Sequence, residues 1–317
     1  MKKRNKIILS IVLVGLILFS TVTYIVGQMV YNGSVGSKTE VAKDEMIDFY
    51  SKKEDKRLET LNKYKHEKLF VKNPKNGYDI EVMNIKSNKE TNDVIVIVHG
   101  IESNYYEVLN SAFNYLENGY NVVVYNQRHT GETGGENYTF GLYERFDLDE
   151  VVNYAASTYK DGILGVHGFS MGAATSTMHT ELNEEKKKVD FYILDAPYHT
   201  MESAINLGIT GKDVPLIPVK FAEWAGNLYT KTKAGFSYDD IEPYKAVKNI
   251  TVPVMLIHGE DDTTTSPGSS KIIYDNIPHD KKELWLIPGL KHCKADDLIP
   301  EEYFNRIYNF IDKNVRQ

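Results

Sequence analysis

Six short apolar runs constrain the fold of this 317-residue chain most strongly. The run Val94–Val98 (VIVIV) contains only β-branched aliphatic side chains, and a run that is apolar on both faces is typical of a strand buried in a parallel sheet. Similar runs follow at 121–125, 162–166, 189–194, 252–257 and 283–287. Segments with helical patterning lie between or after these runs, at 105–118, 148–159, 171–182, 269–276 and 301–312. Repeating strand–helix units predict an α/β fold with a mostly parallel central sheet, helices on both faces, and ligands at the carboxyl ends of the strands.

Two further segments complete this pattern. Residues 70–71 and 78–85 predict an antiparallel hairpin before the first buried strand. An insertion of more than forty residues, at about 199–243, separates two of the predicted strands. Because an insertion at this point lies over the strand ends, we expect a helical lid.

The lid insertion contains one clear amphipathic pattern. Phe221, Trp224, Ala225 and Leu228 recur at positions i, i+3, i+4 and i+7, which is the spacing of one helix face. We expect Phe221, Trp224 and Leu228 to contact an apolar part of a substrate. A helix that simply packs over the core would give the same pattern.

The N-terminus has the features of a membrane segment. Lys2, Lys3, Arg4 and Lys6 precede the uncharged run 7–26. Its helix would be about 30 Å long, the thickness of the hydrocarbon core of a bilayer. The run is longer than the roughly 7–15 residues of a cleaved signal and has no small-x-small cleavage site after it. We predict an uncleaved, single-pass signal anchor, with secretion after cleavage as the alternative.

The basic residues are expected to remain in the cytoplasm, which places the rest of the chain outside the cell. The predicted organisation comprises a basic segment at 1–6, a transmembrane anchor at 7–28, a charged stalk or helix at 29–66 and a catalytic domain at 67–317.

The composition of the chain limits the classes of partner and ligand that it can bind. The formal net charge of −7 argues against nucleic acid, which requires a basic face. Cys293 is the single cysteine, so the chain is no disulfide scaffold. No H-E-x-x-H motif or other metal-binding pattern is present, and we expect neither a metal nor a cofactor. The sequence does not indicate an oligomeric state.

The segment Gly168-Phe169-Ser170-Met171-Gly172 lies between a predicted strand and a predicted helix. In this setting the G-x-S-x-G pattern resembles the nucleophile elbow of the α/β-hydrolase superfamily. A sharp turn there would expose the Ser170 hydroxyl above the sheet, and the two glycines would leave room for the close crossing. We therefore expect Ser170 to be the nucleophile.

The resemblance also implies an oxyanion hole. His99-Gly100-Ile101 follows the strand after which these hydrolases place the second donor. The backbone N–H groups of Ile101 and Met171 would then bind the oxyanion of the tetrahedral intermediate.

An acid should follow the serine in the chain. After the run 252–257, the family pattern H-G-x-x-D places this acid at Asp262. Glu260 and Asp261 are close competitors. Asp195 is the alternative, because some hydrolases carry the acid after that strand.

The base should come last. His292 lies in a loop just after the run 283–287, and it is the only histidine beyond His279. This place matches the base loop of the family, so we expect His292 to accept the proton of Ser170 while Asp262 orients its ring.

The resemblance covers about residues 67–314 and includes all four parts in order. Together with the N-terminal anchor, it is similar to membrane-anchored cell-surface serine hydrolases of Gram-positive bacteria. It implies a serine hydrolase acting on a small-molecule ester or other acyl substrate, like a carboxylesterase or lipase. A serine peptidase or amidase of the aminopeptidase-like branch, with Glu102 near a peptide amine, is the alternative. A non-catalytic binding module on the same fold is a third reading.

Overall fold

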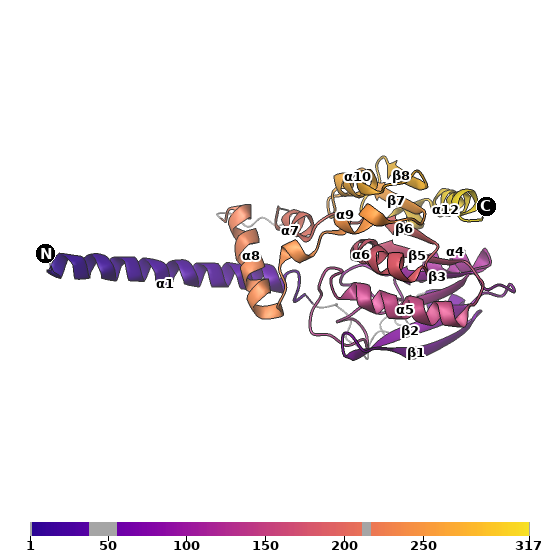
Figure 1. Ribbon diagram of the computed structural model, residues 1–317, viewed down its shortest axis with the longest axis horizontal. Coiled ribbons are helices and arrows are strands. Elements are labelled where there is room, and N and C mark those ends of the chain that lie inside the picture. Colours follow the sequence, from indigo (N-terminus) through magenta and orange to yellow (C-terminus); the bar gives the residue numbers. More distant parts are fainter. Residues whose placement is uncertain (1, 38–55, 211–216, 317) are drawn as a thin grey trace.

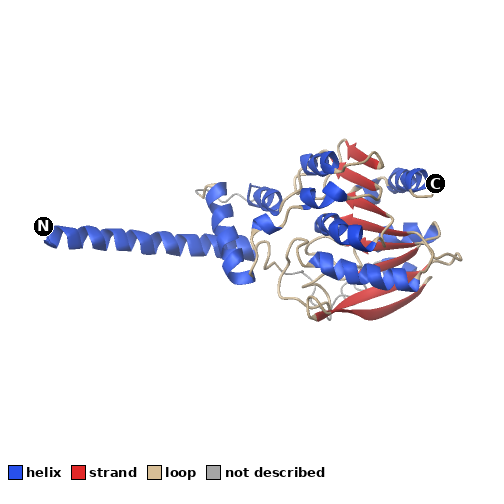
Figure 2. Ribbon diagram, in the orientation of Figure 1, coloured by secondary structure: helices blue, strands red, loops and turns tan. Residues whose placement is uncertain are grey.

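The computed structural model describes residues 2–37, 56–210 and 217–316 of the chain (Figures 1 and 2). Its centre is one eight-stranded sheet with the strand order β1-β2-β4-β3-β5-β6-β7-β8. The first two strands form an antiparallel hairpin, β2 pairs antiparallel with β4, and all other neighbours are parallel. The strands are β1 (Lys65–Asn73), β2 (Tyr78–Lys86), β3 (Val94–Val98), β4 (Asn121–Tyr125), β5 (Leu164–Phe169), β6 (Phe191–Asp195), β7 (Val254–Gly259) and β8 (Lys282–Ile287).

Helices cover both faces of the sheet, as the apolar runs predicted (Figure 2). In β3, Ile95 and Ile97 belong to the apolar cluster on one face, and the three valines belong to the cluster on the other. The first face carries α4 (Leu109–Glu117), α11 (Ala295–Leu298) and α12 (Pro300–Asn314). The second face carries α5 (Glu144–Thr158), α6 (Met171–Lys186) and α10 (Pro267–Asn276).

This is the predicted α/β-hydrolase architecture. The bounds of β3 and β4 agree with the prediction, whereas β5 extends three residues beyond it, to Phe169. The extension matters because it carries the chain directly into Ser170, and α6 begins at the next residue, Met171.

The insertion is helical, as expected. It contains α7 (Met201–Thr210), α8 (Val219–Ala234), η2 (Tyr238–Asp240) and α9 (Pro243–Ala246), and η3 (Val247–Asn249) follows it. An apolar cluster above the sheet joins α7 and η2 to the start of α6 through Met201, Tyr238 and Met171. The lid is therefore packed onto the element that carries the site.

The N-terminal run forms α1 (Lys2–Asn32), which projects away from the domain (Figure 1). Residues Lys3–Asn32 are long and apolar enough to cross a membrane. The helix continues past residue 28, the predicted end of the anchor, and α8 packs across its C-terminal part. Of the predicted stalk, 38–55 lie outside the described residues, and α3 (Lys56–Leu61) follows them.

The loop after β4 is held by hydrogen bonds and not by an ion pair between Arg128 and Glu144 or Asp147. Arg128 Nε donates to the carbonyl of Asn137 at 2.7 Å. Glu144 instead accepts from the backbone N–H groups of Thr139 and Gly141. Asp147 accepts from Asn73, Asn76 and Tyr78 of the first hairpin. Neutral donors, and not Arg128, therefore bind both carboxylates.

The tight crossing of α6 over β3 generates a stability prediction. A Cβ atom at Gly172 would lie 2.2 Å from the carbonyl oxygen of Val98, whereas one at Gly268 would meet nothing nearer than Ser266 Oγ at 3.4 Å. We expect Gly172→Ala to reduce the free energy of unfolding by roughly 1–3 kcal/mol or more, because the backbones must separate. Gly268→Ala is the matched control and should be neutral or slightly stabilising. Denaturant unfolding of the full chain in detergent measures both, and equal midpoints would contradict this account.

Candidate active site

Ser170 lies in a strained turn between β5 and α6. Its backbone has φ 53° and ψ −117°, a conformation with positive φ that non-glycine residues rarely adopt. Its N–H donates to the carbonyl of Asp195 at 2.8 Å, which ties the turn to β6. A Cβ atom at Gly168 would lie 2.4 Å from the carbonyl oxygen of Gly172, so both glycines are needed for the crossing, as the sequence predicted.

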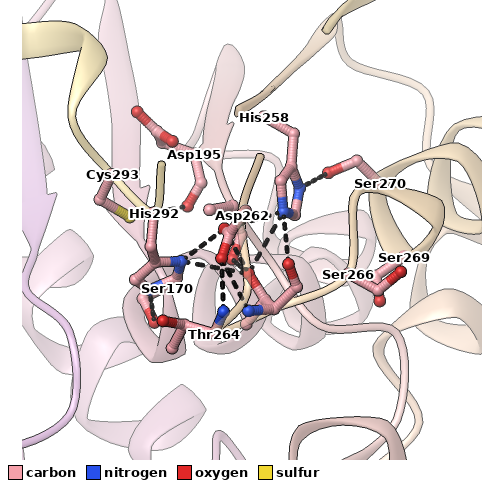
Figure 3. A network of polar contacts seen from close by, with 12 residues as sticks. Ser170, Asp195, His258, Asp262, Thr264, Ser266, Ser269, Ser270, His292 and Cys293 are labelled. Atoms are coloured by element: carbon pink, nitrogen blue, oxygen red, sulfur yellow. Dashed lines mark hydrogen bonds and ion pairs between the residues drawn. The ribbon is translucent and has the colours of Figure 1, made fainter. Parts of the chain in front are cut away.

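The structure brings Ser170, His292 and Asp262 together in one hydrogen-bonded row (Figure 3). His292 Nε2 lies 2.8 Å from Ser170 Oγ, and His292 Nδ1 lies 2.6 Å from Asp262 Oδ2. With Nδ1–H donating to the carboxylate, Nε2 is left as the acceptor for the serine hydroxyl proton. The three side chains follow the ends of β5, β7 and β8, which are far apart in the chain but lie in the same half of the sheet, with only β6 between β5 and β7.

Asp262 is held as an anion by its surroundings. The backbone N–H groups of Thr264 and Thr265 donate to Oδ1 at 2.7 and 3.0 Å, and the Thr265 hydroxyl donates to Oδ2 at 3.0 Å. Burial alone would raise the pKa of Asp262. Hydrogen bonds from His258 and His292, the charge of His292 and the Thr265 N–H outweigh burial and hold this pKa well below its usual range.

His258 has a role in the site that its sequence pattern does not indicate. Its Nε2 lies 3.1 Å from Asp262 Oδ2 and its Nδ1 lies 2.7 Å from Ser270 Oγ (Figure 3). The ring is fully buried and fixes the carboxylate from the side opposite His292. The sequence feature that could have indicated this contact is the position of His258 at the end of β7, four residues before Asp262.

The backbone of Gly100 and Ile101 lies beside the serine. A Cβ atom at Gly100 would be 4.0 Å from Ser170 Oγ. Within the described parts of the chain, the N–H groups of Ile101 and Met171 meet no hydrogen-bond acceptor. Two free donors next to the hydroxyl are the arrangement that a tetrahedral oxyanion requires.

An apolar cavity of about 440 Å³ opens over Ser170 and the two donors. From the lid it is lined by Ala204, Ile205, Ile217 and Ala222, and from the domain by Ile101, Phe140, Met171 and Tyr198. An acidic side chain, Glu102, lies on the same lining. The rest of the lining comes from Thr264 and Thr265 after β7, and from α1 and the loop that follows it.

The structure corrects the predicted substrate contacts. Phe221, Trp224 and Leu228 form the expected face of α8, yet none of them lines this cavity. Trp224 and Leu228 are 49% and 44% exposed and flank a groove beside α1. Phe221 and Trp224 pack against Phe19 of α1. The apolar face of α8 thus faces the N-terminal helix, a partner that helical periodicity does not identify.

Asp195, the alternative acid, lies elsewhere in the core. Its Oδ2 accepts from the Tyr303 hydroxyl at 2.7 Å, and His292 reaches Asp262 instead. Complete burial, with the charges of Asp296 and Asp262, raises the pKa of Asp195 to about 8 against the opposing Tyr303 hydrogen bond. Among the described residues, no group of three His, Cys, Asp or Glu side chains is placed to hold a metal ion.

Comparisons with known proteins agree with this fold. The model of the family described as "Serine aminopeptidase, S33" matches residues 89–243 and 241–298. The uncharacterized protein YqkD of Bacillus subtilis is 27% identical, over 74% of this chain and 76% of its own. Monoglyceride lipase of Saccharomyces cerevisiae is 27% identical, over 71% and 87%. The Pyrococcus furiosus esterase Pf2001 superimposes with a TM-score of 0.65 and 23% identity, over 81% and 95%, which indicates a shared fold.

The raised pKa of Asp195 predicts a pH dependence of stability. The folded state holds this proton more tightly than the unfolded chain, where the pKa is about 3.9. The contribution is therefore complete below about pH 4 and is lost as the pH rises toward about 8, at roughly 1.4 kcal/mol per pH unit. Asp195→Asn should remove this slope, as unfolding at pH 5, 6.5 and 8 would measure. Parallel stability curves for wild type and variant would contradict the assignment.

Proposed function

Because this chain belongs to the serine aminopeptidase S33 family of α/β-hydrolases, we propose that it is a serine hydrolase that cleaves an ester through an acyl-Ser170 intermediate. The observation that carries the proposal is the row Ser170, His292 and Asp262, with contacts of 2.8 and 2.6 Å, beside two unpaired backbone donors. A hydroxyl, a base and an anion in this order suit acyl transfer.

Acylation begins when Ser170 Oγ attacks the carbonyl carbon of the ester. His292 Nε2 takes the hydroxyl proton, and Asp262 stabilises the imidazolium that forms. The carbonyl oxygen becomes an oxyanion held by the N–H groups of Ile101 and Met171, each worth about 10²–10³ in rate. When the tetrahedral intermediate collapses, the C–O bond to the alcohol breaks and His292 gives its proton to the leaving oxygen.

Deacylation repeats these roles with water. His292 removes a proton from a water molecule, whose oxygen attacks the acyl carbon. The same two N–H groups hold the second oxyanion. The bond to Ser170 Oγ then breaks, the acid product leaves, and the proton on His292 returns to the serine.

The lining of the cavity favours an apolar acyl group. Aliphatic and aromatic side chains surround the space over Ser170, and burial of an acyl chain there is favourable by about 0.8 kcal/mol per CH₂ group. The names of two similar proteins, an esterase and a monoglyceride lipase, agree with an ester.

A peptidase is the second candidate, and Glu102 is the observation that favours it. This exposed acidic side chain lies on the cavity lining, where it can pair with the amine of a peptide N-terminus. If so, Glu102→Gln would lower the kcat/KM for aminoacyl anilides far more than for uncharged esters. Equal effects on both substrates would rule out this role of Glu102 and leave ester hydrolysis as the only proposed activity.

The same proposal includes the location of the enzyme. We infer that α1 stays attached as a single-pass anchor and that its four N-terminal cations remain in the cytoplasm. The hydrolase domain then lies on the outer face of the membrane.

An activity-based probe tests the nucleophile. A fluorophosphonate should label the full-length protein in detergent, and Ser170→Ala should abolish labelling because the attacking oxygen is gone. Ser266→Ala, which removes an exposed helix-capping hydroxyl, is the matched control and should label like the wild type. A folded wild type that stays unlabelled would contradict the proposal and favour a non-catalytic binding module.

A pair of isosteric variants tests the acid. Asp262→Asn should lower kcat by about 10⁴-fold, because an amide no longer selects the His292 tautomer that accepts the serine proton. Asp195→Asn should leave kcat within about threefold, since this carboxyl bonds to Tyr303 instead of His292. Kinetics on a short-chain ester distinguish the two, and a larger loss in Asp195→Asn would reverse the assignment.

A further inference from the structure

The C-terminal end of α1 is built into the hydrolase domain. Val35, just after the helix, is fully buried in the apolar cluster that contains Met171. Its carbonyl oxygen accepts from the N–H of Tyr138 at 2.9 Å, which joins it to the loop after β4. Ser34 and Ser37 are also buried. A simple tether would not contribute residues to the core in this way.

Small residues hold α1 and α8 in direct contact. A Cβ atom at Gly27 would lie 2.5 Å from the carbonyl oxygen of Ala225, and one at Gly226 would lie 2.6 Å from Val30 Cγ1. Neither position has room for a side chain, so the two helix backbones approach closely where they cross (Figure 1). The aromatic pair of Tyr31 and Tyr229 supports the same contact.

One wall of the cavity over Ser170 belongs to this part of α1. Val26, Met29 and Val30 line the cavity from the helix, and the turn after it adds Gly33, Ser34 and Ser37. Met29 is 56% exposed although it lines the cavity. The wall therefore reaches the molecular surface at Met29, on the anchor helix itself.

The same wall lies at the end of the membrane segment. Val26 lies near the end of the predicted anchor at 7–28, and it already lines the cavity. Seven residues earlier, Phe19 contacts Trp224 of α8, whose ring is about half exposed. Exposed tryptophan and tyrosine side chains, here Trp224 and Tyr24, are typical of the boundary between bilayer and water.

We propose that α1 is part of the acyl-chain site and that the substrate is an acyl ester dissolved in the membrane that α1 spans. This inference rests on the proposed ester hydrolase function and deepens it. An acyl chain that moves along α1 past Met29 passes from hydrocarbon to an apolar cavity. Because it never crosses water, it avoids a cost of about 0.8 kcal/mol for each exposed CH₂ group. Loss of α1 by signal cleavage would remove this wall.

A photo-cross-linking experiment on the full-length protein in phosphatidylcholine nanodiscs tests the proposal. The probe is a fluorophosphonate with a long alkyl chain that carries a diazirine near its middle. After it reacts with Ser170, irradiation should cross-link the chain to the α1 segment around Val26–Val30, as peptide mass spectrometry would map.

Two outcomes overturn the inference and are distinguishable. Labelling of Ser170 with cross-links confined to residues beyond 56, and none in α1, would leave the hydrolase intact and refute the α1 wall. Absence of Ser170-dependent labelling would refute the hydrolase and the inference with it.

A matched pair of variants gives an independent readout. Met29→Trp places a bulky ring in the cavity wall, whereas Ile25→Trp places one a turn earlier, on an exposed position outside the lining. In nanodiscs we expect Met29→Trp to lower the kcat/KM ratio of a long-chain to an acetyl ester about tenfold, and Ile25→Trp to change it less than about twofold. Equal ratios for the two variants would contradict a substrate path along α1.

Discussion

The backbone conformation of Ser170 is the constraint on which the rest of the site depends. A positive φ at a residue with a side chain costs on the order of 1–3 kcal/mol, and contacts with the surrounding structure must offset this cost. Three features offset it together: the hydrogen bond from the Ser170 N–H to the Asp195 carbonyl, the close crossing at Gly168 and Gly172, and the packing of helix α6. The same turn aims the hydroxyl at His292 and leaves the Met171 N–H unpaired.

The sheet and the lid have different roles in the site. The reacting side chains follow the ends of three parallel strands. The order of these strands in the sheet determines how the side chains are arranged. The lid and α1 enclose the space where an acyl chain fits, and they contact each other through Gly27 and Gly226. Binding and chemistry thus depend on different parts of the chain, which explains why one hydrolase fold accepts many substrates.

Much of this arrangement could be predicted from local sequence, because apolar runs report strands and a short motif reports the Ser170 turn. The chain order of Asp262 and His292 also placed both side chains where the structure brings them together. The sequence could not indicate which helices and side chains that are distant in the chain contact each other in the fold. Periodicity indicated the apolar face of α8 but not its neighbour, so Trp224 was expected to contact the substrate and packs against Phe19 of α1 instead. The contact of His258 with Asp262 likewise depends on the fold of the loop between them.

The acyl-enzyme itself offers the most direct test. The full-length protein, mixed rapidly with a p-nitrophenyl ester and quenched with acid within the first turnover, should release a burst of p-nitrophenol close to one equivalent of enzyme. Mass spectrometry should find the acyl group on the peptide that contains Ser170, because water attacks only after the alcohol has left. Turnover without any acylated peptide, or an acyl group on another residue, would contradict nucleophilic catalysis by Ser170.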